Sequence, residues 1–147
     1  MSTLKVDTYL TRGGASEIAI DKLKGVTAAG SMLVVGEGGT VTTNLQQGLA
    51  KVLVYSDGAA NITDNLNISS GTDRGTGTYQ YFFANNLANT TYYTSGSIDN
   101  VARIFSVTDT YGGDDGRATN YVIINSYTHA GSGEDKRNST IIHGDLA

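Results

Sequence analysis

Short runs of alternating or apolar residues recur between residues 51 and 147, separated at regular intervals by turns rich in Gly, Asn and Asp. These turn residues accept a positive φ or bond to their own backbone, so the pattern indicates about seven strands. The predicted strands cover residues 51–55, 60–69, 78–84, 90–98, 101–109, 119–128 and 138–143. The predicted turns cover residues 57–58, 71–77, 85–86, 99–100, 112–116 and 131–133. The expected fold is all-β, an antiparallel β-sandwich or jelly-roll-like domain.

Composition narrows the classes of partner. The chain has 19 Gly and 9 Tyr but no Cys, which excludes disulfides and thiolate metal sites. Its ten basic residues are scattered and its net charge is −4, whereas nucleic-acid binders gather Lys and Arg into a patch. No apolar run reaches the ~18 residues of a membrane-spanning helix, and residues 1–5 lack the apolar stretch of a secretory signal. We expect a product made in a cytoplasm, with no nucleic-acid partner and no membrane insertion.

The N-terminal third differs from the rest of the chain. Tyr9 is the one aromatic residue among residues 1–50, so the compact core is expected in the second segment. We place the boundary near Gly48, which gives an N-terminal attachment or shaft segment (residues 1–48) and a C-terminal β-domain (residues 49–147). Residues 16–24 favour a short helix, although their alternation also fits a strand.

Residues 30–45 have the composition of a hairpin, because a glycine-rich turn at residues 36–39 separates two short apolar runs. The N-terminal fifty residues as a whole have too little apolar bulk to bury their own surface. We interpret this N-terminal segment as a shaft or collar whose Leu, Val and Ile side chains meet those of neighbouring copies.

Two predicted strands are apolar on both faces. In residues 119–128, Tyr121 and Ile123 oppose Val122 and Ile124, and residues 101–109 show the same pattern. A sandwich strand in a monomer is expected to keep one face in water. The pattern therefore predicts a second partner surface, which self-association would supply.

The ionisable residues form no recognisable catalytic or metal motif. His129 and His143 have no second ligand at a metal-binding spacing, and structural or surface roles are expected for both. Asp109, Asp114 and Asp115 surround a glycine-rich turn, but they lack the alternate spacing of a calcium loop. The sequence therefore predicts a solvated turn there, with no cofactor, no metal and no enzymatic activity.

Adjacent tyrosines suggest a recognition surface. Tyr92 and Tyr93 would point to opposite faces of a strand, so that one enters the core and the other stays outside. Tyrosine among Asn, Ser, Thr and Gly is typical of adaptable binding surfaces. Ordinary cross-strand packing is the alternative.

Three segments carry a family resemblance. A strand, the pattern Ser-Ser-x-Thr-Asp-x-Gly-Thr-Gly at residues 69–77 and an aromatic strand follow one another. This order resembles the terminal domain of short tailed-phage fibre proteins of the marine or cyanophage type. The opening residues 2–8 (Ser-Thr-Leu-Lys-Val-Asp-Thr) and residues 47–52 (Gln-Gly-Leu-Ala-Lys-Val) resemble other parts of the same proteins.

The resemblance implies a non-enzymatic virion fibre that forms a homotrimer. Its N-terminal segment would contact other virion proteins, and polar loops at its far end would bind a glycan or protein of the host surface. The candidate receptor-binding residues are Tyr111, Asp114, Asp115, Arg117, His129 and Asp135. The alternatives are a capsid-decorating head fibre or cement protein, and a polysaccharide-degrading tail spike.

Overall fold

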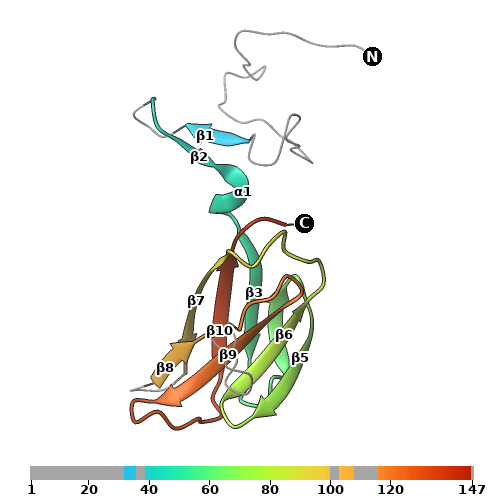
Figure 1. Ribbon diagram of the computed structural model, residues 1–147, viewed down its shortest axis with the longest axis vertical. Coiled ribbons are helices and arrows are strands. Elements are labelled where there is room, and N and C mark those ends of the chain that lie inside the picture. Colours follow the sequence, from blue (N-terminus) through green and yellow to red (C-terminus); the bar gives the residue numbers. More distant parts are fainter. Residues whose placement is uncertain (1–31, 36–38, 100–102, 108–115, 147) are drawn as a thin grey trace, which may run out of the picture.

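The computed structural model describes residues 32–35, 39–99, 103–107 and 116–146, and these residues form three antiparallel sheets (Figure 1). The N-terminal elements are β1 (Leu33–Val35), β2 (Thr42–Asn44) and the single helical turn α1 (Leu45–Gly48). The remaining strands are β3 (Ala50–Ser56), β4 (Ile62–Leu66), β5 (Ile68–Gly75), β6 (Thr78–Phe83), β7 (Tyr93–Ile98), β8 (Arg103–Ser106), β9 (Tyr121–Thr128) and β10 (Asn138–His143).

Two four-stranded sheets make up the sandwich. The first has the strand order β4-β3-β10-β7 and the second has the order β5-β6-β9-β8. Both are antiparallel throughout, which confirms the predicted all-β, sandwich-like architecture. The ribbon β1-β2 and α1 lie beyond the end of the sandwich at which β3 begins (Figure 1). We call the opposite end, formed by loops 57–61, 76–77 and 129–137, the distal end.

Alternating side chains of both sheets build the core. Val52 and Val54 of β3 meet aromatic residues of β6 and aliphatic residues of β9, because every second side chain of each strand points inward. The fully buried Tyr79 and Tyr81 keep their hydroxyl groups hydrogen-bonded. Tyr79 Oη accepts the backbone N–H of Lys136 at 2.8 Å, and Tyr81 Oη donates to Asn138 Oδ1 at 3.0 Å. The core thus depends on polar contacts between the sheets as well as on apolar packing.

Most predicted strands agree with the structure, but the segment from residue 60 to residue 77 was predicted wrongly. The predicted strand 60–69 is broken at Asn67, whose φ of 61° ends β4 and lets the chain enter the other sheet as β5. Asn tolerates this left-handed conformation, and its side chain fixes the bend by accepting the backbone N–H of Asn85 at 2.7 Å.

The predicted turn 71–77 is wrong for the same region, because β5 continues to Gly75 and the turn comprises Thr76 and Gly77. Gly71 lies within β5 and allows the backbone of Ala60 to pack closely against it. A Cβ atom at this position would lie 2.3 Å from the carbonyl oxygen of Ala60. The predicted hairpin in residues 30–45 is present as the antiparallel pair β1-β2. The predicted helix at 16–24 lies outside the described residues.

The chain itself hides both faces of β9. Val122 and Ile124 lie in the core, and Ile123 on the opposite face is also fully buried. The segment before β9 folds back along it, since Ile123 N donates to Gly116 O at 2.7 Å. The expectation that β9 needs a second copy of the chain is therefore wrong. Ile104 of β8 is half-exposed, whereas Val101 and Ala102 lie outside the described residues.

Candidate binding surface

The outer face of the sheet β4-β3-β10-β7 carries two rows of side chains, each running across all four strands in register. The row nearer α1, which we call the apolar row, comprises Leu66, Leu53, Ile141 and Ser95. The row nearer the distal end, which we call the polar row, comprises Asp64, Tyr55, Ser139 and Ser97. This face thus changes from apolar to polar along the molecule.

Strand periodicity explains why these side chains reach solvent. Val52, Val54 and Ser56 of β3 point into the core, so Leu53 and Tyr55 between them must point outward. Tyr55 has 41% of its surface exposed, and Leu53, Leu66 and Ile141 are comparably exposed. An apolar and aromatic surface on the outer face of a sandwich is typical of an interaction site.

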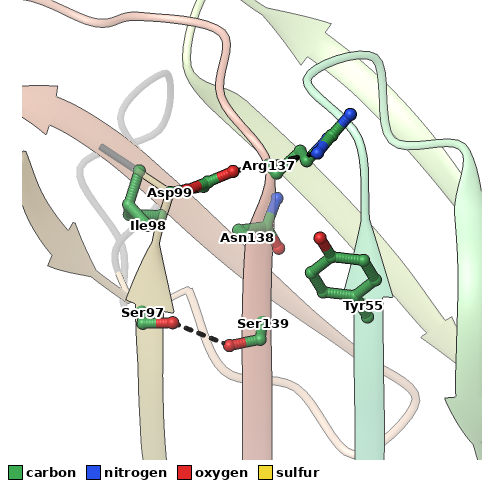
Figure 2. Close-up of a pocket in the computed structure, with 7 residues that line it drawn as sticks. All are labelled: Tyr55, Ser97, Ile98, Asp99, Arg137, Asn138 and Ser139. Carbon is green, nitrogen blue, oxygen red and sulfur yellow. Dashed lines mark hydrogen bonds and ion pairs between the residues drawn. The ribbon is translucent and has the colours of Figure 1, made fainter.

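A hollow of about 270 Å³ lies beside Tyr55 at the distal end of this face (Figure 2). We call it the Tyr55 hollow; it is lined by Tyr55, Ser97, Ile98, Asp99, Arg137, Asn138 and Ser139. The hydroxyl oxygens of Ser97 and Ser139 are hydrogen-bonded across β7 and β10 at 2.9 Å. Figure 2 shows this pair on one side of the hollow, with Asp99 and Arg137 above it.

The charged groups at the rim of the Tyr55 hollow are held loosely, although their backbones are fixed. Asp99 N donates to Arg137 O at 2.9 Å, which ties the end of β7 to the start of β10. The side chains are separated by 4.0 Å and each is more than three-fifths exposed. An exposed pair at this distance contributes little to stability. Both side chains can therefore turn toward a ligand at small cost.

A second hollow of about 210 Å³ lies on the other side of Tyr55. It is lined by Leu53, Val54, Tyr55, Asp64, Asn65, Ser139, Thr140 and Ile141. Tyr55 and Ser139 belong to both hollows, so the two form one shallow track across β7, β10, β3 and β4. Tyr55 stands at its centre.

The floor of the Tyr55 hollow is rigid. Asn138 is buried, and its side-chain amide donates to Ser56 Oγ at 3.1 Å while its oxygen accepts from Tyr81. Nearby, the Asp57 carboxylate accepts hydrogen bonds from the Asn61 side chain and from the backbone N–H groups of Ala59 and Asn61. These bonds, the Asn61 side chain first, lower the pKa of Asp57, with a smaller contribution from the charge of Arg137.

Of the six residues predicted to bind a receptor, the three that the structure describes do not all lie at one end of the sandwich. Tyr111, Asp114 and Asp115 lie outside the described residues. Arg117 pairs with Val122 near the start of β9, whereas the exposed His129 follows Thr128 at its end. Val122 and Thr128 are about 20 Å apart along the strand, at ~3.3 Å per residue.

Asp135 does lie at the distal end, but its carboxylate has a structural contact. Its Oδ1 accepts the backbone N–H of Gly77 at 2.6 Å, which holds the loop before β10 against the turn between β5 and β6. Neighbouring Glu134 is paired with Arg103 and with Lys136, the latter at 2.9 Å. These ion pairs lower the pKa of Glu134, with the hydrogen bond from Lys136 as the largest cause.

Sequence reasoning missed Tyr55, Asp99 and Arg137 as members of one site. The outward position of Tyr55 could have been read from the alternation of β3 around Val52 and Val54. Its proximity to Asp99 and Arg137 could not, because it depends on β3 and β7 flanking β10, which is a tertiary arrangement.

One of the two adjacent tyrosines is buried and the other is exposed, as predicted. Tyr92 is buried and packs edge-on against Phe83, whereas Tyr93 is 79% exposed on the outer face of β7. Within the described ranges, no group of three or more His, Cys, Asp or Glu residues could hold a metal ion. No helix in the same part of the chain is long and apolar enough to span a membrane.

Comparisons with known proteins identify no relative of this chain. No protein-family model, no curated protein and no solved structure matches this chain.

Proposed function

We propose that this chain is the subunit of a bacteriophage virion fibre, which attaches the particle to its host without catalysing a reaction. The resemblance of residues 2–8, 47–52 and 69–77 to tailed-phage fibre proteins supports this proposal. The layout of the molecule supports it too. The ribbon β1-β2 lies at one end of the sandwich and the polar loops lie at the other (Figure 1).

The observation that carries the proposal is the exposed apolar surface of the ribbon. Leu33, Val34 and Val35 of β1 are all half-exposed, and Val41 beside β2 is 74% exposed. A two-stranded ribbon is marginally stable by itself in water. Side chains of this kind on such a ribbon need a partner, and copies of the same chain are the simplest one.

A hollow of about 440 Å³ adds further apolar surface where the sandwich meets α1. Leu49, Leu66 and Leu146 line it at the junction between α1 and β3. We propose that the ribbon and this junction form the interface of a homotrimer, with the number of copies taken from the resemblance. The proposed division into an attachment segment (residues 1–48) and a β-domain (residues 49–147) falls at this junction.

In the proposed fibre, the two ends have different partners. The N-terminal segment contacts other virion proteins, and the outer sheet face and distal loops contact a glycan or protein of the host surface. Neither nucleic acid nor a membrane interior is a partner. His129 and Asp135 lie in the loop at the distal end, whereas Arg117 lies nearer the other end.

Antibody labelling of intact virions tests the location. We expect an antibody raised against residues 49–147 to label the tail and to block adsorption of the phage to its host. Labelling spread over the head would contradict the proposal in favour of a capsid-decorating protein. Release of new reducing ends from host envelope polysaccharide by the purified protein would contradict the non-enzymatic role.

A further inference from the structure

The aromatic ring of Tyr55 lies on a surface built from polar groups and a few aliphatic side chains. The face of an aromatic ring is the negative part of its quadrupole, so it attracts the weakly positive C–H groups of a flat ligand. Leu53 and Ile141 extend this surface beside the ring. A ligand with both C–H faces and hydroxyl edges would fit this combination.

Groups suited to hydroxyl ligands surround the ring. Ser97 and Ser139 bond to each other, and each hydroxyl oxygen keeps further acceptor capacity. The carboxylates of Asp99 and Asp64 accept from hydroxyl groups, and the guanidinium of Arg137 donates to them. Charge-assisted bonds of this type are about twice as strong as neutral ones.

From this geometry we infer that the track of two hollows binds a neutral oligosaccharide, with a sugar ring on each side of Tyr55. Each hollow, at about 270 and 210 Å³, lies below the ~300 Å³ of a typical small-molecule site, so each suits a single ring. Because both share Tyr55 and Ser139, the ligand is a chain that crosses the strands.

The charge of the track selects against acidic sugars. Asp64 and Asp99 lie at its two ends, and Arg137 contributes the single positive charge among its lining residues. The chain as a whole carries a net charge of −4. A uronic-acid chain would place further carboxylates against these groups at an electrostatic cost.

A peptide fits the track less well than a sugar. Peptides that bind sheets generally add a strand to an open edge, where backbone groups are unpaired. The centre of the track lies over β3 and β10, and both of these strands are hydrogen-bonded to a strand on each side. The centre of the track therefore offers side chains without free backbone groups, which matches hydroxyl recognition.

The source of the sugar, a host-surface glycan, is taken from the proposed function. The site itself is argued from geometry alone. Calorimetric titration of the purified full chain tests it directly, with neutral tetrasaccharides of glucose, mannose and galactose as probes and tetragalacturonate as the acidic counterpart. We expect at least one neutral probe to bind with a Kd of about 1 mM or tighter.

Three variants locate the binding. Tyr55→Thr should weaken it by about tenfold or more, Tyr55→Phe should retain most of it, and Asp99→Asn should weaken it by a smaller factor. Tyr93→Thr is the matched control, since Tyr93 is more exposed than Tyr55 and lies on the same face. We expect its affinity to equal that of the natural chain.

Several results would overturn the inference: no neutral probe bound at 10 mM, tighter binding of tetragalacturonate or of an extended uncharged peptide, or equal losses in Tyr55→Thr and Tyr93→Thr. The two proposals fail separately. Sugar binding by the purified chain without virion labelling would refute the fibre, whereas tail labelling without sugar binding would refute the site.

Discussion

Tyr79 and Tyr81 bury their rings between the sheets, and the structure must therefore provide partners for two phenolic hydroxyl groups. Lys136 and Asn138 at the start of β10 supply them. Burial raises the pKa of Tyr79 from its usual 10.0 to about 12, because the phenolate would lose its hydration. The pKa of Tyr81 is raised for the same reason.

These shifts predict a loss of stability at high pH. Above pH 10 the unfolded chain gives up the Tyr79 proton while the folded chain retains it, so the free energy of unfolding falls as pH rises. The loss from Tyr79 begins near pH 10 and is complete near pH 12, because these are the pKa values of the unfolded and folded chains.

Urea unfolding at pH 8, 10, 11 and 12 measures this loss. Tyr79→Phe should be less stable at pH 8, since the Lys136 N–H loses its acceptor, but its stability should fall less steeply above pH 10. Tyr93→Phe is the control, because Tyr93 is exposed, and should follow the natural chain. Parallel curves for all three proteins would show that Tyr79 ionises normally.

Among the strands, β6 and β10 could be predicted from the sequence almost to the residue, because alternating inward side chains define them. The region from Asn67 to Gly77 could not. Asn67 and Gly71 are both typical turn residues, and the sequence does not reveal that the first bends the chain between sheets and the second permits close backbone packing. That distinction depends on Ala60, which only the folded structure brings near.

Gly71 gives a direct test of this interpretation. In Gly71→Ala the new methyl group would meet the Ala60 carbonyl, which a backbone neighbour cannot easily relieve. We expect a loss of about 1–3 kcal/mol in the free energy of unfolding, measured by urea denaturation. The matched control is Gly48→Ala, which has open space around the new Cβ and should change stability by at most about 0.5 kcal/mol. Equal stability of both variants would refute the packing role.

At the scale of the whole molecule, sequence reasoning anticipated surplus apolar surface but placed part of it wrongly. β9 hides Ile123 within the chain, whereas Leu53 and Ile141 on the opposite sheet and the ribbon side chains stay exposed. No local pattern in the sequence encodes which of these side chains the folded chain covers. The candidate site could not be predicted from the sequence either, because it joins residues from β3, β7 and β10.

The central physical claim is that the ribbon β1-β2 brings copies of the chain together. Val34→Asp would place a charge on the exposed surface of β1 while leaving the sandwich core untouched. Tyr55→Asp is the control, because Tyr55 is similarly exposed but lies on the outer face of β3 near the distal end, away from the ribbon.

Light scattering of the full chain at micromolar concentration tests this claim most directly. We predict a mass three times the 15.4 kDa of one chain for the natural protein and for Tyr55→Asp. For Val34→Asp we predict a shift toward monomer, with the β-sheet circular dichroism retained. A natural chain that remains a soluble, cooperatively folded monomer at this concentration would contradict the account.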